Sequence, residues 1–142
     1  MVTIIRAGPH ERDIEGIREA LDKLYNIVFE LKNRLESGRY TEGMIIADIK
    51  TINMLSEVLS SALNSIYRTA LNNPMYNADL GHIRVILEAV AATDTAFRQA
   101  LIHGQEYPEY FPSEVYGAVV DSLPLLERAR AELNILISRR II

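Results

Sequence analysis

The chain has 142 residues, of which 49% are hydrophobic and 24% charged, with a net charge of −4 and no cysteine. This length suits a single domain that buries a real hydrophobic core. The lack of cysteine excludes disulfides, thiolate metal sites and cysteine nucleophiles. The sequence lacks the basic excess typical of non-specific nucleic-acid binders, so any role with RNA requires a local site.

Nothing in the sequence predicts a membrane segment. No run approaches the eighteen or so apolar residues of a membrane span, and the opening "MVTII" is too short for a signal-peptide core. We therefore expect a cytoplasmic protein with no membrane partner. The abundance of isoleucine, leucine and arginine, with few glutamines, leans towards a thermophilic source.

The first two predicted elements are helices at about residues 9–36 and 41–72, separated by "SGRYT". Pro9 suits a first helical turn, Ser37-Gly38 a helix end, and Thr41 the next N-cap. The first helix carries a heptad seam of Ile14, Ile17, Leu21, Leu24, Val28, Leu31 and Leu35. The inward line of the second is Ile45, Ile49, Ile52, Leu55, Leu59, Ala62 and Ile66.

Two further helices are predicted at about residues 79–103 and 113–138, after the connections "NNPMYNAD" and "HGQEYPEYFPS". Gly104 is expected to end the third helix and Ser113 to cap the fourth. The third carries Ile83, Leu87, Val90, Asp94, Phe97 and Leu101 on one stripe, in which the aspartate is out of place. The fourth carries Val115, Val119, Leu123, Leu126, Leu133 and Leu136.

These elements predict one all-α domain, an up-down antiparallel four-helix bundle over residues 1–142. Short connections between long amphipathic helices make sequence neighbours antiparallel. Pro124 is expected to kink or split the last helix, because proline removes a helical hydrogen bond and clashes with the preceding turn. No β-pattern competes with this interpretation.

The residues with the clearest chemical potential are Arg98 and His103, in "FRQALIHGQEY". An imidazole can take a proton from a 2′-hydroxyl or give one to a leaving oxygen, and a guanidinium can grip a phosphate. Five positions correspond to about 140° of rotation on a continuous helix. The two side chains would therefore converge only in a frayed last turn or across two chains. Asp94, one turn before Arg98, is placed to orient the guanidinium.

The segment "FRQALIH" resembles the HEPN superfamily, whose mark is an arginine, four to six residues and a histidine, as in its usual "FRNxLVH". The terminal helix beginning "PSEVYGAVVDSLPLLERA" is also similar to that family. The resemblance implies a helical, metal-independent endoribonuclease or toxin with no cofactor, active as a homodimer with both motifs facing across the interface. Some members work beside a nucleotidyltransferase-type antitoxin.

By this resemblance Arg98 would bind phosphate, His103 would be the acid/base, and Asp94 would match the acidic residue upstream of the arginine. Gln99 stands where the family usually has asparagine. We expect it to contact substrate with Tyr107 and Tyr110, since aromatics beside an arginine can stack RNA bases. The alternative is that the aromatics of "YPEYFP" seal the end of the bundle.

Simpler alternatives remain open for the whole motif. Arg98 can be a solvated residue paired with Asp94, and His103 a favourable charge at a helix C-terminus. His10 and His82 lack the Glu-x-x-His spacing of a di-metal bundle, so we expect no metal and place both on the surface near helix starts. The same bundle would serve a non-enzymatic coat or scaffold subunit that forms a homo-oligomer, or an adaptor that binds protein through its tyrosine-rich loop.

Overall fold

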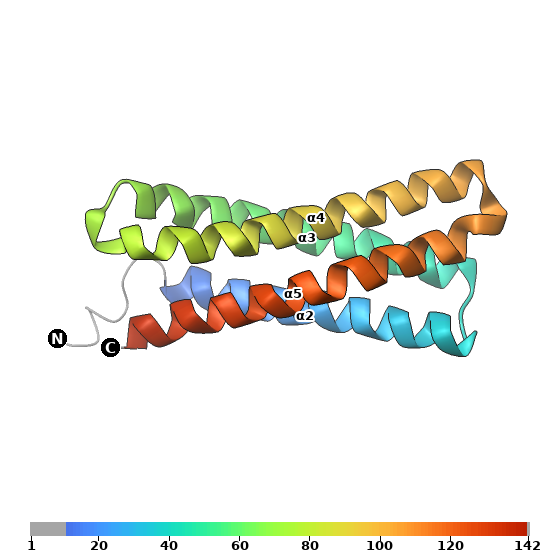
Figure 1. The fold of residues 1–142 in the computed structure, drawn as a ribbon, viewed down its shortest axis with the longest axis horizontal. Helices are drawn as coiled ribbons and strands as arrows, with labels where there is room; N and C mark the ends of the chain where they lie inside the picture. Colours follow the sequence, from blue (N-terminus) through green and yellow to red (C-terminus); the bar gives the residue numbers. More distant parts are fainter. Residues whose placement is uncertain (1–10, 142) are drawn as a thin grey trace.

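Four long helices make up the computed structural model, which describes residues 11–141 and the side chains of residues 14–139 (Figure 1). They are α2 (Glu11–Ser37), α3 (Glu42–Leu71), α4 (Leu80–Glu106) and α5 (Phe111–Ile141). Two 3-10 helices, η1 (Pro74–Asp79) and η2 (Pro108–Tyr110), lie in the second and third connections. The described part of the chain contains no strand, so the predicted all-α bundle is confirmed. The expected start at Pro9 lies outside the described residues.

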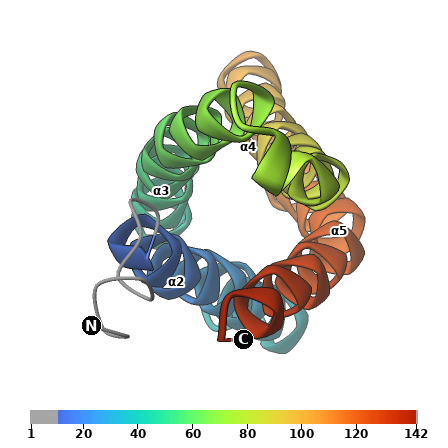
Figure 2. The same ribbon diagram turned by 90° about the vertical axis from the view of Figure 1, so that its left-hand side faces the viewer.

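The helices run along the long axis of the molecule, each antiparallel to its neighbours in sequence (Figure 1). Seen end-on, they stand in chain order around a square, so that α5 closes the ring against α2 and α4 lies diagonally opposite α2 (Figure 2). This is the up-down arrangement that short connections impose. It leaves the outer face of every helix at the surface.

The core lies along the bundle axis and uses most of the predicted apolar lines. The seam of α2 is buried from Ile14 to Leu31, while Leu35 is only half-buried. In the other three helices the buried stripe is rotated slightly about the helix axis relative to the predicted one. Half-buried are Leu55, Ala62, Leu87, Leu101 and Leu123, whereas Ser56, Leu63, Ile86, Thr93, Ala100 and Ser122 are fully buried. Several of these buried side chains are small, because little volume remains where helices pack closely.

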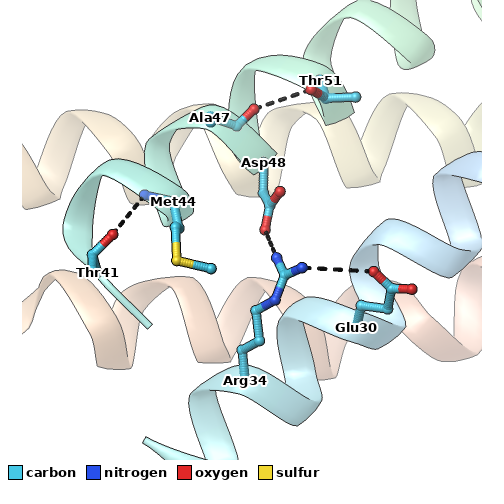
Figure 3. A network of polar contacts seen from close by, with 7 residues as sticks. All are labelled: Glu30, Arg34, Thr41, Met44, Ala47, Asp48 and Thr51. Carbon is cyan, nitrogen blue, oxygen red and sulfur yellow. Dashed lines mark hydrogen bonds and ion pairs between the residues drawn. The ribbon is translucent and has the colours of Figure 1, made fainter. Parts of the chain in front are cut away.

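The connection between α2 and α3 forms as predicted. Gly38 adopts a left-handed φ of 72°, and the Arg39 amide donates to the Arg34 carbonyl at 3.1 Å, which ends α2. Thr41 caps α3, its hydroxyl accepting from the Met44 amide at 3.2 Å (Figure 3). Both helix ends therefore follow directly from local residue chemistry.

An ion pair joins the same two helices near this connection. Arg34 Nη1 donates to Asp48 Oδ2 at 2.8 Å, and Arg34 Nη2 lies 3.8 Å from Glu30 Oε2 (Figure 3). Burial of the carboxyl nevertheless raises the pKa of Asp48, because desolvation outweighs the opposing effect of Arg34. The pair links α2 to α3.

The predicted helix end at Gly104 is wrong, because α4 continues to Glu106. Gly104 is buried in regular helix, and a Cβ built there would meet Cδ1 of Phe111 at 2.0 Å. The glycine thus allows the Phe111 ring to pack directly on the α4 backbone. Close approach, and not left-handed geometry, explains this residue.

The predicted start of α5 is also wrong, and so is one of the two outcomes expected at Pro124. The helix begins at Phe111, so Ser113 lies inside its first turn and donates its hydroxyl to the Tyr110 carbonyl at 3.0 Å. The predicted split at Pro124 does not occur, because α5 continues through the proline as one element to Ile141, while the predicted kink stays a prediction. The helix packs against α4 and α2, and such packing can keep a helix continuous through a proline.

Candidate functional site on α4 and α5

Arg98 lies on the side of α4 that faces α3. Its Nε donates to Asp94 Oδ2 at 3.0 Å, and its Nη2 donates to Glu57 Oε1 of α3, also at 3.0 Å. These bonds, with Asp94 contributing most, raise the pKa of the guanidinium above its usual range. The predicted i, i+4 partnership with Asp94 is confirmed. The arginine also links α4 to α3.

His103 lies on the other side of α4, towards α5. Its Nδ1 is 3.6 Å from Glu114 Oε2, and its carbonyl accepts from the Tyr107 amide at 2.8 Å. The residue therefore belongs to the regular last turn of α4 and does not fray. Its side chain is 55% exposed, so the imidazole remains open to solvent.

The structure does not bring Arg98 and His103 together within one chain. They point to α3 and α5 respectively, as about 140° of helical rotation requires. Of the two ways in which the sequence allowed them to converge, a frayed last turn is contradicted by the continuous helix. Convergence across two chains stays a prediction.

A groove runs along the outside of the molecule between α4 and α5, which we call the α4–α5 groove. Its two hollows have volumes of about 400 and 450 Å³ and share Ala96, Gln99 and Asp121. The first also has Ala100, His103, Ser113, Glu114, Gly117 and Ala118 in its wall. The second also has Ala91, Ala92, Thr95, Ser122 and Leu125. Small side chains on both helices make the groove.

The polar groups of this groove are few and mainly acidic. Glu114 and Asp121 both line it, with His103 as its basic side chain. Ser122 is only 1% exposed, and its hydroxyl has no hydrogen-bond partner within the described chain. A buried hydroxyl without a partner is costly unless something else satisfies it. This hydroxyl lies beneath the surface of the groove and is not accessible from it.

The aromatic residues of this loop differ in burial, which bears on the two predicted roles, sealing the bundle end and contacting a substrate. Phe111 is buried against Gly104 and does seal this end of the bundle. Tyr107 and Tyr110 are 55% and 57% exposed, with ring centroids 6.4 Å apart. The predicted sealing role is therefore wrong for the two tyrosines, whose rings remain accessible. Their predicted contact with a substrate stays a prediction.

The metal site, the other two histidines and a membrane segment were also considered from the sequence. Among the described residues no three histidine, aspartate or glutamate side chains gather in a way that could hold a metal ion. His10 lies outside the described residues. His82 is not the plain surface residue that was expected, since its Nδ1 contacts the Glu132 carboxylate of α5. No helix in residues 11–141 carries an apolar stretch long enough to cross a bilayer.

Sequence reasoning missed Glu57, Glu114 and Ser122. The two glutamates lie on other helices, so no local spacing relates them to Arg98 or His103. Ser122 lies beside the predicted apolar line of α5, three residues after Val119, and this helical spacing was the available signal that it is buried.

Comparison with protein-family models, with curated proteins and with solved structures finds no match to this chain.

Proposed function

We propose that this protein is a non-enzymatic helical subunit that associates with copies of itself through the α4–α5 groove. The observation that carries the proposal is the second hollow, whose lining is mainly small side chains from both helices. Small residues let a partner's backbone come close.

The charge of the groove also favours protein over RNA. Glu114 and Asp121 would repel phosphate, and no lysine or arginine lines either hollow. Arg98 is already held by two carboxylates, so a phosphate would have to displace Glu57 or Asp94. A protein surface needs no such displacement.

The test is the mass of the protein in solution, measured by light scattering after size-exclusion chromatography. We expect more than one chain per particle for the wild type and a single chain for Ala92→Arg, which fills the groove from an exposed position. Ala47→Arg is the matched control, because Ala47 is exposed on α3 away from the groove. A wild type that stays single at every concentration would overturn the proposal.

A metal-independent endoribonuclease of HEPN type is the second candidate. The observation in its favour is that Arg98 and His103 are both about half exposed on one helix, where a second copy could complete a site. Its partners would be RNA and a nucleotidyltransferase-type antitoxin. Gln99, Tyr107 and Tyr110, all exposed, would contact the RNA. A cytoplasmic location belongs to both candidates.

This candidate is tested by incubating RNA, in the presence of a chelator, with wild-type protein and with His103→Ala. The candidate predicts cleavage by the wild type that the substitution reduces by about 100-fold or more. Equal cleavage by the two proteins, or cleavage by neither, would eliminate it.

A further inference from the structure

The outer face of α4 carries a second regular seam, directed away from the core. Its six residues are all exposed and recur at steps of four and three: Arg84, Glu88, Ala91, Thr95, Arg98 and Ile102. We call these residues the outer seam. A repeat of this kind keeps one line of side chains facing a neighbouring helix. In the described chain α4 packs with α3 and α5, and neither covers this line.

The outer seams of two copies are complementary to each other when the two α4 helices run antiparallel. If two copies of α4 are laid antiparallel with their centres at residue 93, Glu88 meets Arg98 of the other copy and Ala91 meets Thr95. Both contacts occur twice because of the twofold symmetry. At each end Arg84 meets Ile102, with Glu106 one turn further along. A parallel arrangement would instead place each charge against the same charge, which is unfavourable.

The middle of the outer seam coincides with the α4–α5 groove. Ala91 and Thr95 line the second hollow of this groove, so a helix on the seam would also lie along the groove. Small residues at the centre allow an interaxial distance near the lower end of about 8–10 Å. Arg98 can take part, because its Nη1 makes no hydrogen bond or ion pair within the described residues.

We propose that two copies of this chain form a twofold dimer through antiparallel outer seams of α4, with Glu88 of each copy paired to Arg98 of the other. This inference rests on the proposed self-association and names its partner and geometry. In the dimer Arg98 holds three helices together, namely its own α4, α3 through Glu57, and α4 of the second copy. Arg98 then serves to hold the two copies together.

Disulfide trapping tests this geometry. The chain has no native cysteine, so only the introduced cysteines can form a disulfide. Two tagged chains, Ala91→Cys and Thr95→Cys, are mixed and oxidised. In the antiparallel dimer position 91 faces position 95 of the other copy at a Cα separation that a disulfide can span, about 4.4–6.8 Å. We expect mixed disulfide dimers to form at least about tenfold faster than dimers of either variant alone.

Asn26→Cys on the exposed side of α2 is the control and is expected to remain monomeric under the same oxidation. Disulfides mainly between like positions would indicate a parallel arrangement and overturn the inference. Particles of more than one chain without mixed disulfides would also overturn it, while leaving self-association intact. A single-chain particle would instead overturn the proposed function itself.

Discussion

Gly104 shows how one residue can be read correctly as special and still be assigned the wrong role. A glycine near the end of a helical pattern usually marks a left-handed cap, as Gly38 does with its φ of 72°. At Gly104 the requirement comes from Phe111, seven residues further on, whose ring occupies the space of a Cβ. Local sequence cannot separate the two causes, because the second depends on how α5 folds back.

Gly104→Ala is therefore expected to lower the free energy of unfolding by about 1–3 kcal/mol, since the added methyl must push the Phe111 ring aside. Urea denaturation followed by circular dichroism measures this change. Gly16→Ala in α2 is the control, because a Cβ there has open space, and it should raise stability by about 0.5–1 kcal/mol. Equal effects of the two substitutions would contradict the account of Gly104.

Arg98 illustrates how far the sequence could describe the site. Its bond to Asp94 was predictable from the i, i+4 spacing, and the 140° between Arg98 and His103 followed from the helical repeat. The bond to Glu57 was not predictable, because it depends on the register between α3 and α4. Register is set by packing along both helices, which no local pattern contains.

At the scale of elements, periodicity predicted all four helices, while their ends depended on chemistry beyond the local pattern. Thr41 and Gly38 worked as predicted because their partners lie within a few residues. The start of α5 was misplaced because Pro112 and Ser113 fit a first helical turn as well as a cap. The predicted split at Pro124 did not occur, since tertiary packing can keep a helix continuous through a proline.

Pro124→Ala is expected to raise the free energy of unfolding by about 1–3 kcal/mol, because it restores the amide that can donate to the carbonyl of Val120. Pro124 is exposed, so the change leaves the core intact. Chemical denaturation with an unchanged m-value measures the gain. A loss of stability would indicate that α5 needs the proline for its shape.

The contact between α5 and α2 gives the bundle a dependence on pH. The Tyr116 hydroxyl donates to Glu36 Oε2 at 2.7 Å, and this bond lowers the pKa of Glu36. A lowered carboxyl pKa in the folded state means that the contact stabilises the protein above the ordinary pKa of glutamate. The contribution is lost as the pH falls through the folded pKa.

Tyr116→Phe should therefore raise the pKa of Glu36 towards its ordinary value, measured by carbon NMR of the labelled side-chain carboxyl. The pH dependence of unfolding between about pH 5 and 3 should become shallower, because the folded and unfolded pKa values approach each other. An unchanged Glu36 pKa in this variant would show that the hydrogen bond is not its cause.

At the scale of the whole molecule, four amphipathic helices satisfy one another's apolar faces and leave α4 with two unusual exterior features. One is the α4–α5 groove with its small side chains. The other is the outer seam, in which Glu88 and Arg98 pair with each other when two copies of α4 run antiparallel. Neither brings Arg98 and His103 together within one chain, because the two side chains diverge around α4, and their convergence across two chains stays a prediction. Both fit an assembly of identical chains, in which Arg98 serves as a link between helices.

The most direct test of this account is the dissociation constant of the dimer, measured by sedimentation equilibrium over a dilution series. The account predicts that the wild type falls from twice the 16.0 kDa chain mass to that mass as it is diluted. Glu88→Arg should raise the dissociation constant by about tenfold or more, because it sets like charges against each other twice. The matched reversal Glu19→Arg, exposed on α2, should leave the constant unchanged. Equal constants for all three proteins, or a 16.0 kDa particle throughout, would contradict the account.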